Sequence, residues 1–205
     1  MSLANPPAAS TTALRAWTRI GPFALLTTAP QTLDSSRSSS LTGADSPALL
    51  RALLASEDRN FYAHSGVDWG AAAASAWRNL WATKTRGAST LSMQLVGLLE
   101  DYERGEATRR GRRNVAQKLT QAGAALWLEQ RWRKDQILEA YLNLASFRGE
   151  LVGVAAMSRG LFGKWPDGID EREAAIAAAL LRSPGAAAPA VAARACGVLQ
   201  AVAQL

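Results

Sequence analysis

The sequence predicts a mainly α-helical fold, and three observations support this. Apolar residues recur at helical spacing in several stretches that carry capping signals at their ends. No stretch of useful length alternates apolar and polar residues as a half-buried strand would. The chain has 205 residues, of which 48% are hydrophobic and 20% charged, so it can bury a core as one domain or as one two-lobed domain.

The N-terminal segment is rich in Ser, Thr, Ala and Pro, and "SSRSSSLTG" is its extreme. This composition is typical of a mobile segment without a packed core. We therefore predict a flexible arm over 1–45 and a folded domain over 46–205.

The first helix is predicted to begin at Ser46 and Pro47, because a serine N-cap followed by proline at the first helical position is a common start. A second helix is expected from Asp68, its N-cap, to about Gly87, and a third after "GAST". The stretch 100–113 has no apolar period and is predicted to be a mobile charged loop. Further helices are expected over about 113–130, 134–144, 150–162 and 171–182, the last with the capping box Asp170-x-x-Glu173, and in the final Ala-rich run.

The formal net charge of +6 suggests an anionic partner, such as nucleic acid, phosphate or an acidic membrane surface. The alternative is a basic protein whose charge only keeps it soluble, and composition alone does not favour either reading. Cys196 is the only cysteine, which excludes an intramolecular disulfide and argues against a thiolate metal site. Its Ala-rich surroundings predict a buried thiol. No stretch is apolar over the roughly 20 residues that a spanning helix needs, so membrane work would require peripheral binding or an anchor that this sequence lacks.

Glu57 is the first candidate for chemistry. It closes the Leu-rich run of "LLASEDRNFYAHSG", where the helix dipole and partial burial both disfavour a charged carboxylate. Such an acid is a better proton acceptor near neutral pH, which suits a general base. Spacing alone favours the alternative, a solvated residue at a helix end.

Two further features suit phosphate chemistry. Ser89 and Thr90 of "GAST" precede a helix, whose free N–H groups could cradle a phosphate or pyrophosphate, although this pattern alone favours the alternative, an ordinary N-cap. The second feature is a basic cluster that suits the binding of phosphate, and a solvated Arg-rich loop is the alternative reading. The members of the cluster are Arg109, Arg110, Arg112, Arg113 and, on the next helix, Lys118.

No helix-turn-helix, zinc or RNA-binding motif accompanies this charge, so nucleic acid is not an expected partner. Trp69, Trp77 and Trp81 share one predicted helix at helical spacing. Packing into the core is the expected role for them, and a face that lies in a membrane interface is the alternative.

Taken together, these pieces resemble the peptidoglycan glycosyltransferase family, which comprises the glycosyltransferase domain of class A penicillin-binding proteins and the monofunctional transglycosylases. "EDRNFYAHSGVD" matches the family's first motif, E-D-x-x-F-x-x-H-x-G-x-D, at every fixed position. "GASTLSMQ" is similar to G-G-S-T-I-T-Q-Q, "QKLTQ" lies where the family has R-K-x-x-E, and "KDQILEAYLN" matches K-x-x-I-L-E-x-Y-L-N. The likeness runs in order over roughly 46–204, and "FRGEL" and the Lys-x-x-Gln variant are most similar to the penicillin-binding protein 1C branch.

The resemblance implies a mainly α, lysozyme-like fold of two lobes, head and jaw, with the smaller lobe resting in the membrane. It implies polymerisation of lipid II, in which the 4-hydroxyl of one lipid II attacks the anomeric carbon of the growing chain and polyprenyl pyrophosphate leaves. Glu57 would be the general base, Gln121 would stand at the second catalytic position, and His64 would shape the loop. The expected binding residues for substrate and pyrophosphate are Asp58, Ser89, Thr90, Gln94, Gln117, Lys118, Arg109 and Arg110.

The resemblance further implies that a divalent metal, Mg or Mn, can assist the pyrophosphate, but it assigns no metal ligand here. The expected partners are lipid II, the growing glycan chain, a membrane surface and other cell-wall synthesis proteins. The expected location is the outer, periplasmic face of the bacterial inner membrane. No Ser-x-x-Lys occurs, so we expect no acyl-serine transpeptidase, and the chain is either an excised domain or a monofunctional form.

The sequence departs from the family pattern near the pyrophosphate: the substituted positions are Met93, Gly97, Gln117 and Gln121. Gln121 can hydrogen-bond but cannot accept a proton as a carboxylate does. Arg109 to Arg113 are hypothesised to replace the lost cations. These departures leave an alternative, a catalytically weak module that binds lipid II or acts as a scaffold, while cleavage of finished glycan is disfavoured by the pyrophosphate-binding motifs.

Overall fold

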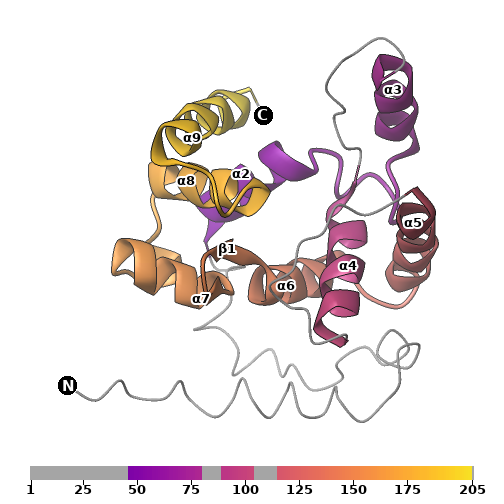
Figure 1. Ribbon diagram of the computed structural model, residues 1–205, viewed down its shortest axis with the longest axis horizontal. Helices are drawn as coiled ribbons and strands as arrows, with labels where there is room; N and C mark the ends of the chain where they lie inside the picture. Colours follow the sequence, from indigo (N-terminus) through magenta and orange to yellow (C-terminus); the bar gives the residue numbers. More distant parts are fainter. Residues whose placement is uncertain (1–45, 80–88, 104–114, 205) are drawn as a thin grey trace.

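The computed structural model describes residues 46–79, 89–103 and 115–204, and its fold is mainly α-helical, as predicted (Figure 1). Its α-helices are α2 (Pro47–Glu57), α3 (Trp69–Asn79), α4 (Leu91–Glu103), α5 (Val115–Glu129), α6 (Lys134–Leu144), α7 (Val154–Met157), α8 (Glu171–Arg182) and α9 (Ala188–Val202). A π-helical turn, η2 (Ser158–Phe162), continues α7, and η3 (Pro166–Gly168) is a short 3-10 helix. The predicted arm over 1–45 lies outside the described residues, and it stays a prediction, as do the two lobes.

Two groups of helices carry the core. Helices α2, α8 and α9 pack on one another, and α4 packs against both α5 and α6 (Figure 1). The buried side chains of both groups form one continuous hydrophobic cluster, in which Phe61, Tyr141 and Phe147 are the largest fully buried residues. Among the residues that the structure describes, none of the helices has the length and apolar character needed to cross a bilayer.

The predicted capping signals operate as expected. The Ser46 hydroxyl accepts a hydrogen bond from the Leu49 N–H at 3.3 Å, and α2 begins at Pro47. Asp170 accepts from the N–H groups of Arg172 and Glu173, both at 2.9 Å, and the Glu173 carboxylate accepts from the Asp170 N–H at 3.0 Å. Both ends of α6 and α8 lie where the sequence predicted them.

The predicted helix over 150–162 was wrong at its start. Strand β1 (Ser146–Arg148) pairs antiparallel with β2 (Leu151–Val152), and α7 begins only at Val154. The two strands are too short to show alternation in the sequence. Gly153, with φ of +84°, comes so close to Asn143 that an added Cβ would lie 2.9 Å from that residue's carbonyl oxygen.

The predicted loop over 100–113 was also wrong at its start, because α4 continues to Glu103. The acids there have neighbours that the local pattern does not reveal: Asp101 is buried, and Glu100 accepts a hydrogen bond from α5. The remainder of that stretch lies outside the described residues.

Two predictions of burial failed. Cys196 is exposed, because α9 turns Val191, Ala195 and Val198 toward the core and Cys196 falls beside that stripe. Trp69 is 67% exposed at the start of α3 instead of packing in the core. The Trp77 side chain and Trp81 lie outside what the structure describes.

Gly66 fixes how the loop after α2 meets α5. Its φ is +96°, and an added Cβ would lie 2.7 Å from both the carbonyl carbon and the carbonyl oxygen of Ala125. A side chain here would be strained by its backbone conformation and would collide with backbone that cannot rotate away.

Gly66→Ala is therefore expected to lower the free energy of unfolding by about 2–4 kcal/mol, as strain and overpacking add. The matched control is Gly163→Ala, at φ of +67° with nothing within 4 Å of the added Cβ, which should cost only about 1 kcal/mol. Denaturant unfolding of both variants measures the difference. Equal losses would contradict the close approach of Gly66 to α5.

The N-cap of α8 should make stability depend on pH. Hydrogen bonding from the Glu173 backbone, followed by that from Arg172 and the charge of Lys164, lowers the pKa of Asp170 below its ordinary value. A lowered folded-state pKa means that the stabilisation is complete above the ordinary carboxyl range near pH 4 and is lost as the pH falls through the lowered value.

Asp170→Ala should therefore lower the melting temperature most at about pH 7, and the gap to the unmodified chain should narrow below about pH 3. Asp170→Asn keeps a capping oxygen without the charge, so its melting temperature at neutral pH should lie between those of Asp170→Ala and the unmodified chain. A gap of the same size at both pH values would mean that the carboxylate charge contributes nothing to the cap.

Candidate active site

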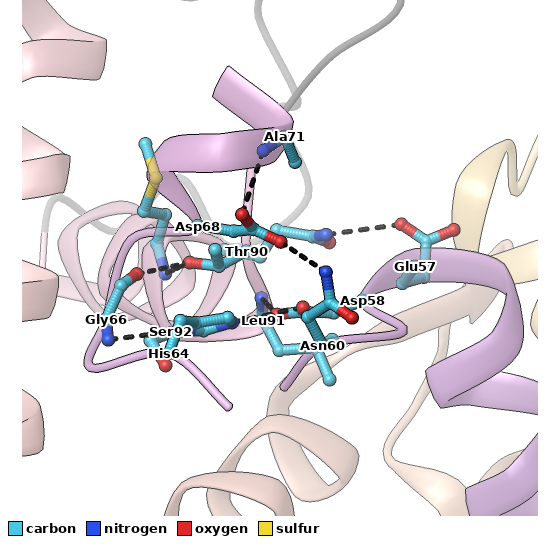
Figure 2. Close-up of polar contacts among 12 residues, drawn as sticks. Glu57, Asp58, Asn60, His64, Gly66, Asp68, Ala71, Thr90, Leu91 and Ser92 are labelled. Carbon is cyan, nitrogen blue, oxygen red and sulfur yellow. Dashed lines mark hydrogen bonds and ion pairs between the residues drawn. The ribbon is translucent and has the colours of Figure 1, made fainter. Parts of the chain in front are cut away.

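Glu57 is the last residue of α2, and two donors hold its carboxylate. The Ser56 hydroxyl donates to Oε1 at 3.2 Å. The Gln94 side-chain amide, in the first turn of α4, donates to Oε2 at 3.2 Å, and Figure 2 shows the Glu57 carboxylate that accepts this hydrogen bond. Tyr141 of α6 lies behind Gln94, and its hydroxyl donates to the Gln94 Oε1 at 3.0 Å. The carboxylate is thus partly buried and fixed by a line of contacts from α6 through α4 to α2.

Asp58 joins the end of α2 to the start of α4. Its buried carboxylate contacts the His64 Nε2 at 3.0 Å and accepts from the Leu91 N–H at 2.9 Å (Figure 2). The Gly66 N–H donates to the His64 Nδ1 at 3.2 Å, so Nε2 is the nitrogen that carries the proton toward Asp58. These contacts give Asp58 a structural role, and its predicted contact with substrate stays a prediction.

The loop over 58–68, which we call the motif loop, is held to α4 a second time. The buried Thr90 hydroxyl donates to the Gly66 carbonyl at 2.5 Å and accepts from the Met93 N–H at 3.2 Å. Thr90 is therefore an N-cap as well as a tether for the motif loop. Ser89, beside it, is only partly buried at the entrance to α4.

Asp68 closes the motif loop on its other side. Its carboxylate accepts from the Ala71 N–H at 2.8 Å, at the start of α3, and from the Asn60 amide at 2.9 Å (Figure 2). The hydrogen bond from Ala71, and next the one from Asn60, lowers the pKa of Asp68 below its ordinary value. The predicted N-cap at Asp68 is confirmed.

A partly buried ion pair between Lys134 and Glu129, which the sequence reasoning missed, lies against the motif loop. The Lys134 Nζ lies 2.6 Å from the Glu129 Oε2 and 4.3 Å from the centre of the Phe61 ring. Glu129 also accepts from the Ser92 hydroxyl, and its Oε1 lies 3.9 Å from the His64 Nδ1. The spacing of Glu129 and Lys134 at the end of one helix and the start of the next was the available signal.

Gln121 is buried on α5, where its side-chain amide donates to the Glu100 Oε2 of α4 at 3.1 Å. The sequence reasoning singled out Gln121 but did not foresee Glu100 as its partner. Gln117 and Lys118 are exposed in the first turns of the same helix. Arg109 and Arg110 lie outside the described residues.

The structure thus arranges the predicted residues around α4. The first turn of α4, which includes Gln94, is contacted by Glu57, Asp58 and Thr90. Gln121 contacts the same helix further along, at Glu100. Chemically, the site offers an oriented carboxylate at one end of α4 and, on α5, the exposed ammonium of Lys118. Within 46–79, 89–103 and 115–204, no three His, Cys, Asp or Glu side chains gather closely enough to hold a metal ion.

Comparison with known proteins follows the same residues. A family model described as transglycosylase matches 27–203, and this match begins inside the segment predicted as an arm. A biosynthetic peptidoglycan transglycosylase of Rhodospirillum centenum is 38% identical over 139 residues, which are 68% of this chain and 57% of that protein. A protein of the same name from Mannheimia succiniciproducens is 35% identical over 139 residues, which are 68% of this chain and 54% of that protein.

Penicillin-binding protein 1C of Escherichia coli is also similar, with 37% identity over 145 residues, which are 70% of this chain and 18% of that much longer protein. The chain spans between 54% and 57% of the length of the two peptidoglycan transglycosylases above. Since the family model covers most of the sequence and includes every part of the site, the chain belongs to the transglycosylase family.

Proposed function

We propose that the chain polymerises lipid II into the glycan strands of peptidoglycan and releases polyprenyl pyrophosphate. The observation that carries this proposal is the position of the Glu57 carboxylate, which the Gln94 amide fixes at 3.2 Å at the end of a helix. The names of its relatives, biosynthetic peptidoglycan transglycosylase and penicillin-binding protein, point to the same chemistry.

In the proposed reaction, Glu57 accepts the proton of the 4-hydroxyl of the incoming lipid II. The hydroxyl oxygen forms a bond to the anomeric carbon of the growing chain, and the bond from that carbon to the pyrophosphate oxygen breaks. The pyrophosphate leaves with the bonding electrons and carries its additional negative charge. A positioned base of this kind contributes about a hundredfold or more to the rate.

Gln94, Ser56 and Tyr141 prepare Glu57 for this step. Both donors hold the carboxylate in one orientation, so that less motion is needed when the 4-hydroxyl arrives. Lys118, exposed in the first turns of α5, is the described cation that we assign to the departing pyrophosphate, where a preorganised positive charge lowers the barrier. Ser89, Gln117, Arg109 and Arg110 belong to the same proposed binding region.

Among the described residues, no three ligating side chains gather into a site that could hold a metal by protein groups alone. A divalent ion such as Mg²⁺ is usually held by one or two carboxylates together with substrate phosphates. We therefore propose that any Mg or Mn that assists the reaction is carried by the pyrophosphate, and we derive no step through it.

The proposed partners follow from the substrate. Lipid II and the growing glycan chain are presented at a membrane surface, so we propose that the chain works on the periplasmic side of the bacterial inner membrane. Other cell-wall synthesis proteins are proposed neighbours there.

One observation favours a second candidate function, a module that binds lipid II but turns it over weakly. Gln121 stands where the family motif has a glutamate, and it is buried as a neutral amide. Incubation of the unmodified chain with lipid II separates the two functions, because only the first yields glycan polymer. Degradation of finished peptidoglycan without lipid II would instead indicate glycan cleavage.

Glu57→Gln is expected to lower the polymerisation rate by about a hundredfold or more, because glutamine has a similar shape but cannot accept the proton. Binding of lipid II should change little, which a direct binding measurement on the same protein checks. Glu171→Gln, at an exposed ion pair of α8 with Arg51, removes the same charge and is the control. Full polymerisation by Glu57→Gln would overturn the assignment of the base.

Tyr141→Phe should lower kcat by roughly tenfold while KM stays within about twofold. The substitution leaves the Gln94 Oε1 without the hydroxyl that now donates to it at 3.0 Å, so the amide can turn away from Glu57. Steady-state kinetics on lipid II give both constants, and a melting curve checks that the variant is folded. An unchanged kcat would mean that Glu57 does not depend on this line of contacts.

A further inference from the structure

Where α4 and α5 pack together, which we call the seam, an amide on one helix donates a hydrogen bond to a carboxylate on the other. The two helices lie side by side (Figure 1). Gln121, 4% exposed on α5, points its amide at α4, and Glu100 accepts that hydrogen bond at 3.1 Å between the Gln121 Nε2 and the Glu100 Oε2. One member of the pair is a neutral donor and the other is a carboxylate.

The direction of this hydrogen bond fixes the position of the negative charge. An amide N–H donates to an ionised carboxylate oxygen without needing an extra proton, so Glu100 can carry its full charge beside Gln121. Two glutamates at the same distance could not both ionise, because like charges that close share a proton. The seam is therefore built for one carboxylate, and the sequence places it on α4.

The position of Glu100 relates it to both halves of the site. Glu100 lies six residues after Gln94 on α4, which is about 9 Å along the helix axis at a rise of about 1.5 Å per residue. Its partner, Gln121, lies three residues after Lys118, so these two share one side of α5. Glu100 thus lies on the same helix as Gln94 and contacts, through Gln121, the helix that carries the Lys118 ammonium.

We infer that Glu100 supplies the carboxylate that the family motif places at position 121. It acts as a positioning residue: its charge, held in place by Gln121, keeps the ammonium of Lys118 turned toward the seam until the pyrophosphate arrives. In this view the carboxylate that the family motif has on α5, at position 121, is supplied from α4 by Glu100, so the site still has a negative group. This inference rests on the proposed function, and it removes the main reason to regard the chain as a weak enzyme.

Glu100→Gln tests the charge with little disturbance of the fold, because an amide at 100 can still accept from the Gln121 amide. The expected result is a fall in kcat for lipid II polymerisation of about tenfold or more, with KM within about twofold. The exchange variant Glu100→Gln with Gln121→Glu returns one carboxylate to the seam from the other helix and should recover kcat to within about threefold.

The single variant Gln121→Glu completes the set, because it places two carboxylates in contact. They should share a proton near neutral pH, which would add an ionisation to the pH profile of kcat that the exchange variant lacks. Glu171→Gln, which loses the same charge at an exposed position of α8, should keep the kcat of the unmodified chain and is the matched control.

Each outcome decides the inference. An unmodified chain that makes no polymer would overturn the proposed function, and this inference with it. An active chain whose Glu100→Gln variant keeps full kcat would overturn the inference alone, as would an exchange variant that is folded by its melting curve but no more active than Glu100→Gln.

Discussion

The buried carboxylate of Asp58 is the contact on which the rest of the site depends. It joins the end of α2 to the first N–H of α4 at 2.9 Å and holds the His64 ring at 3.0 Å. A carboxylate at a helix N-terminus satisfies a donor that has no partner within the helix and is favoured by the helix dipole. Because α2 ends one residue earlier, this contact sets where Glu57 lies relative to Gln94. The acid that carries the proposed chemistry is therefore positioned by the acid beside it.

Local signals predicted the helices well, and for a physical reason. Capping residues such as Ser46 and Asp170 act within three residues of themselves, so their effect is visible in any short stretch of sequence. Long-range contacts override local pattern where the sequence reasoning failed. The acidic end of α4 is helical although it lacks an apolar period, and Cys196 is exposed although its neighbours are apolar. The antiparallel pairing of the short strands β1 and β2, which comes just before α7, was equally invisible in the sequence.

The site divides in the same way. The family motifs predicted Glu57, Gln94 and Gln121 as site residues, because these residues lie at fixed spacing within short stretches of the sequence. The partners of those residues come from far along the chain: Tyr141 is 47 residues from Gln94, and Glu100 is 21 residues from Gln121. A motif records which residue types recur, whereas the direction of a hydrogen bond across a helix seam is set by packing. For this reason the sequence suggested a missing carboxylate, while the structure shows that Gln121 contacts a carboxylate, Glu100, on the neighbouring helix.

An acid at the C-terminal end of a helix is disfavoured by the helix dipole by about 0.3–1 kcal/mol at an exposed position, and by more where it is partly buried. Hydrogen bonds to a charged group return about 1.5–3 kcal/mol each, so the Ser56 hydroxyl and the Gln94 amide can together offset that cost at Glu57. Gln94 could not serve this role if its amide were free to turn, because its oxygen would then repel the carboxylate. The buried Tyr141 hydroxyl prevents this by occupying the amide oxygen, so a tyrosine on α6 decides which way the amide faces on α4. The oriented Gln94 amide therefore stabilises Glu57 at a helix end where an acid is disfavoured. The same hydrogen bond keeps the carboxylate in a fixed orientation for the approach of a hydroxyl.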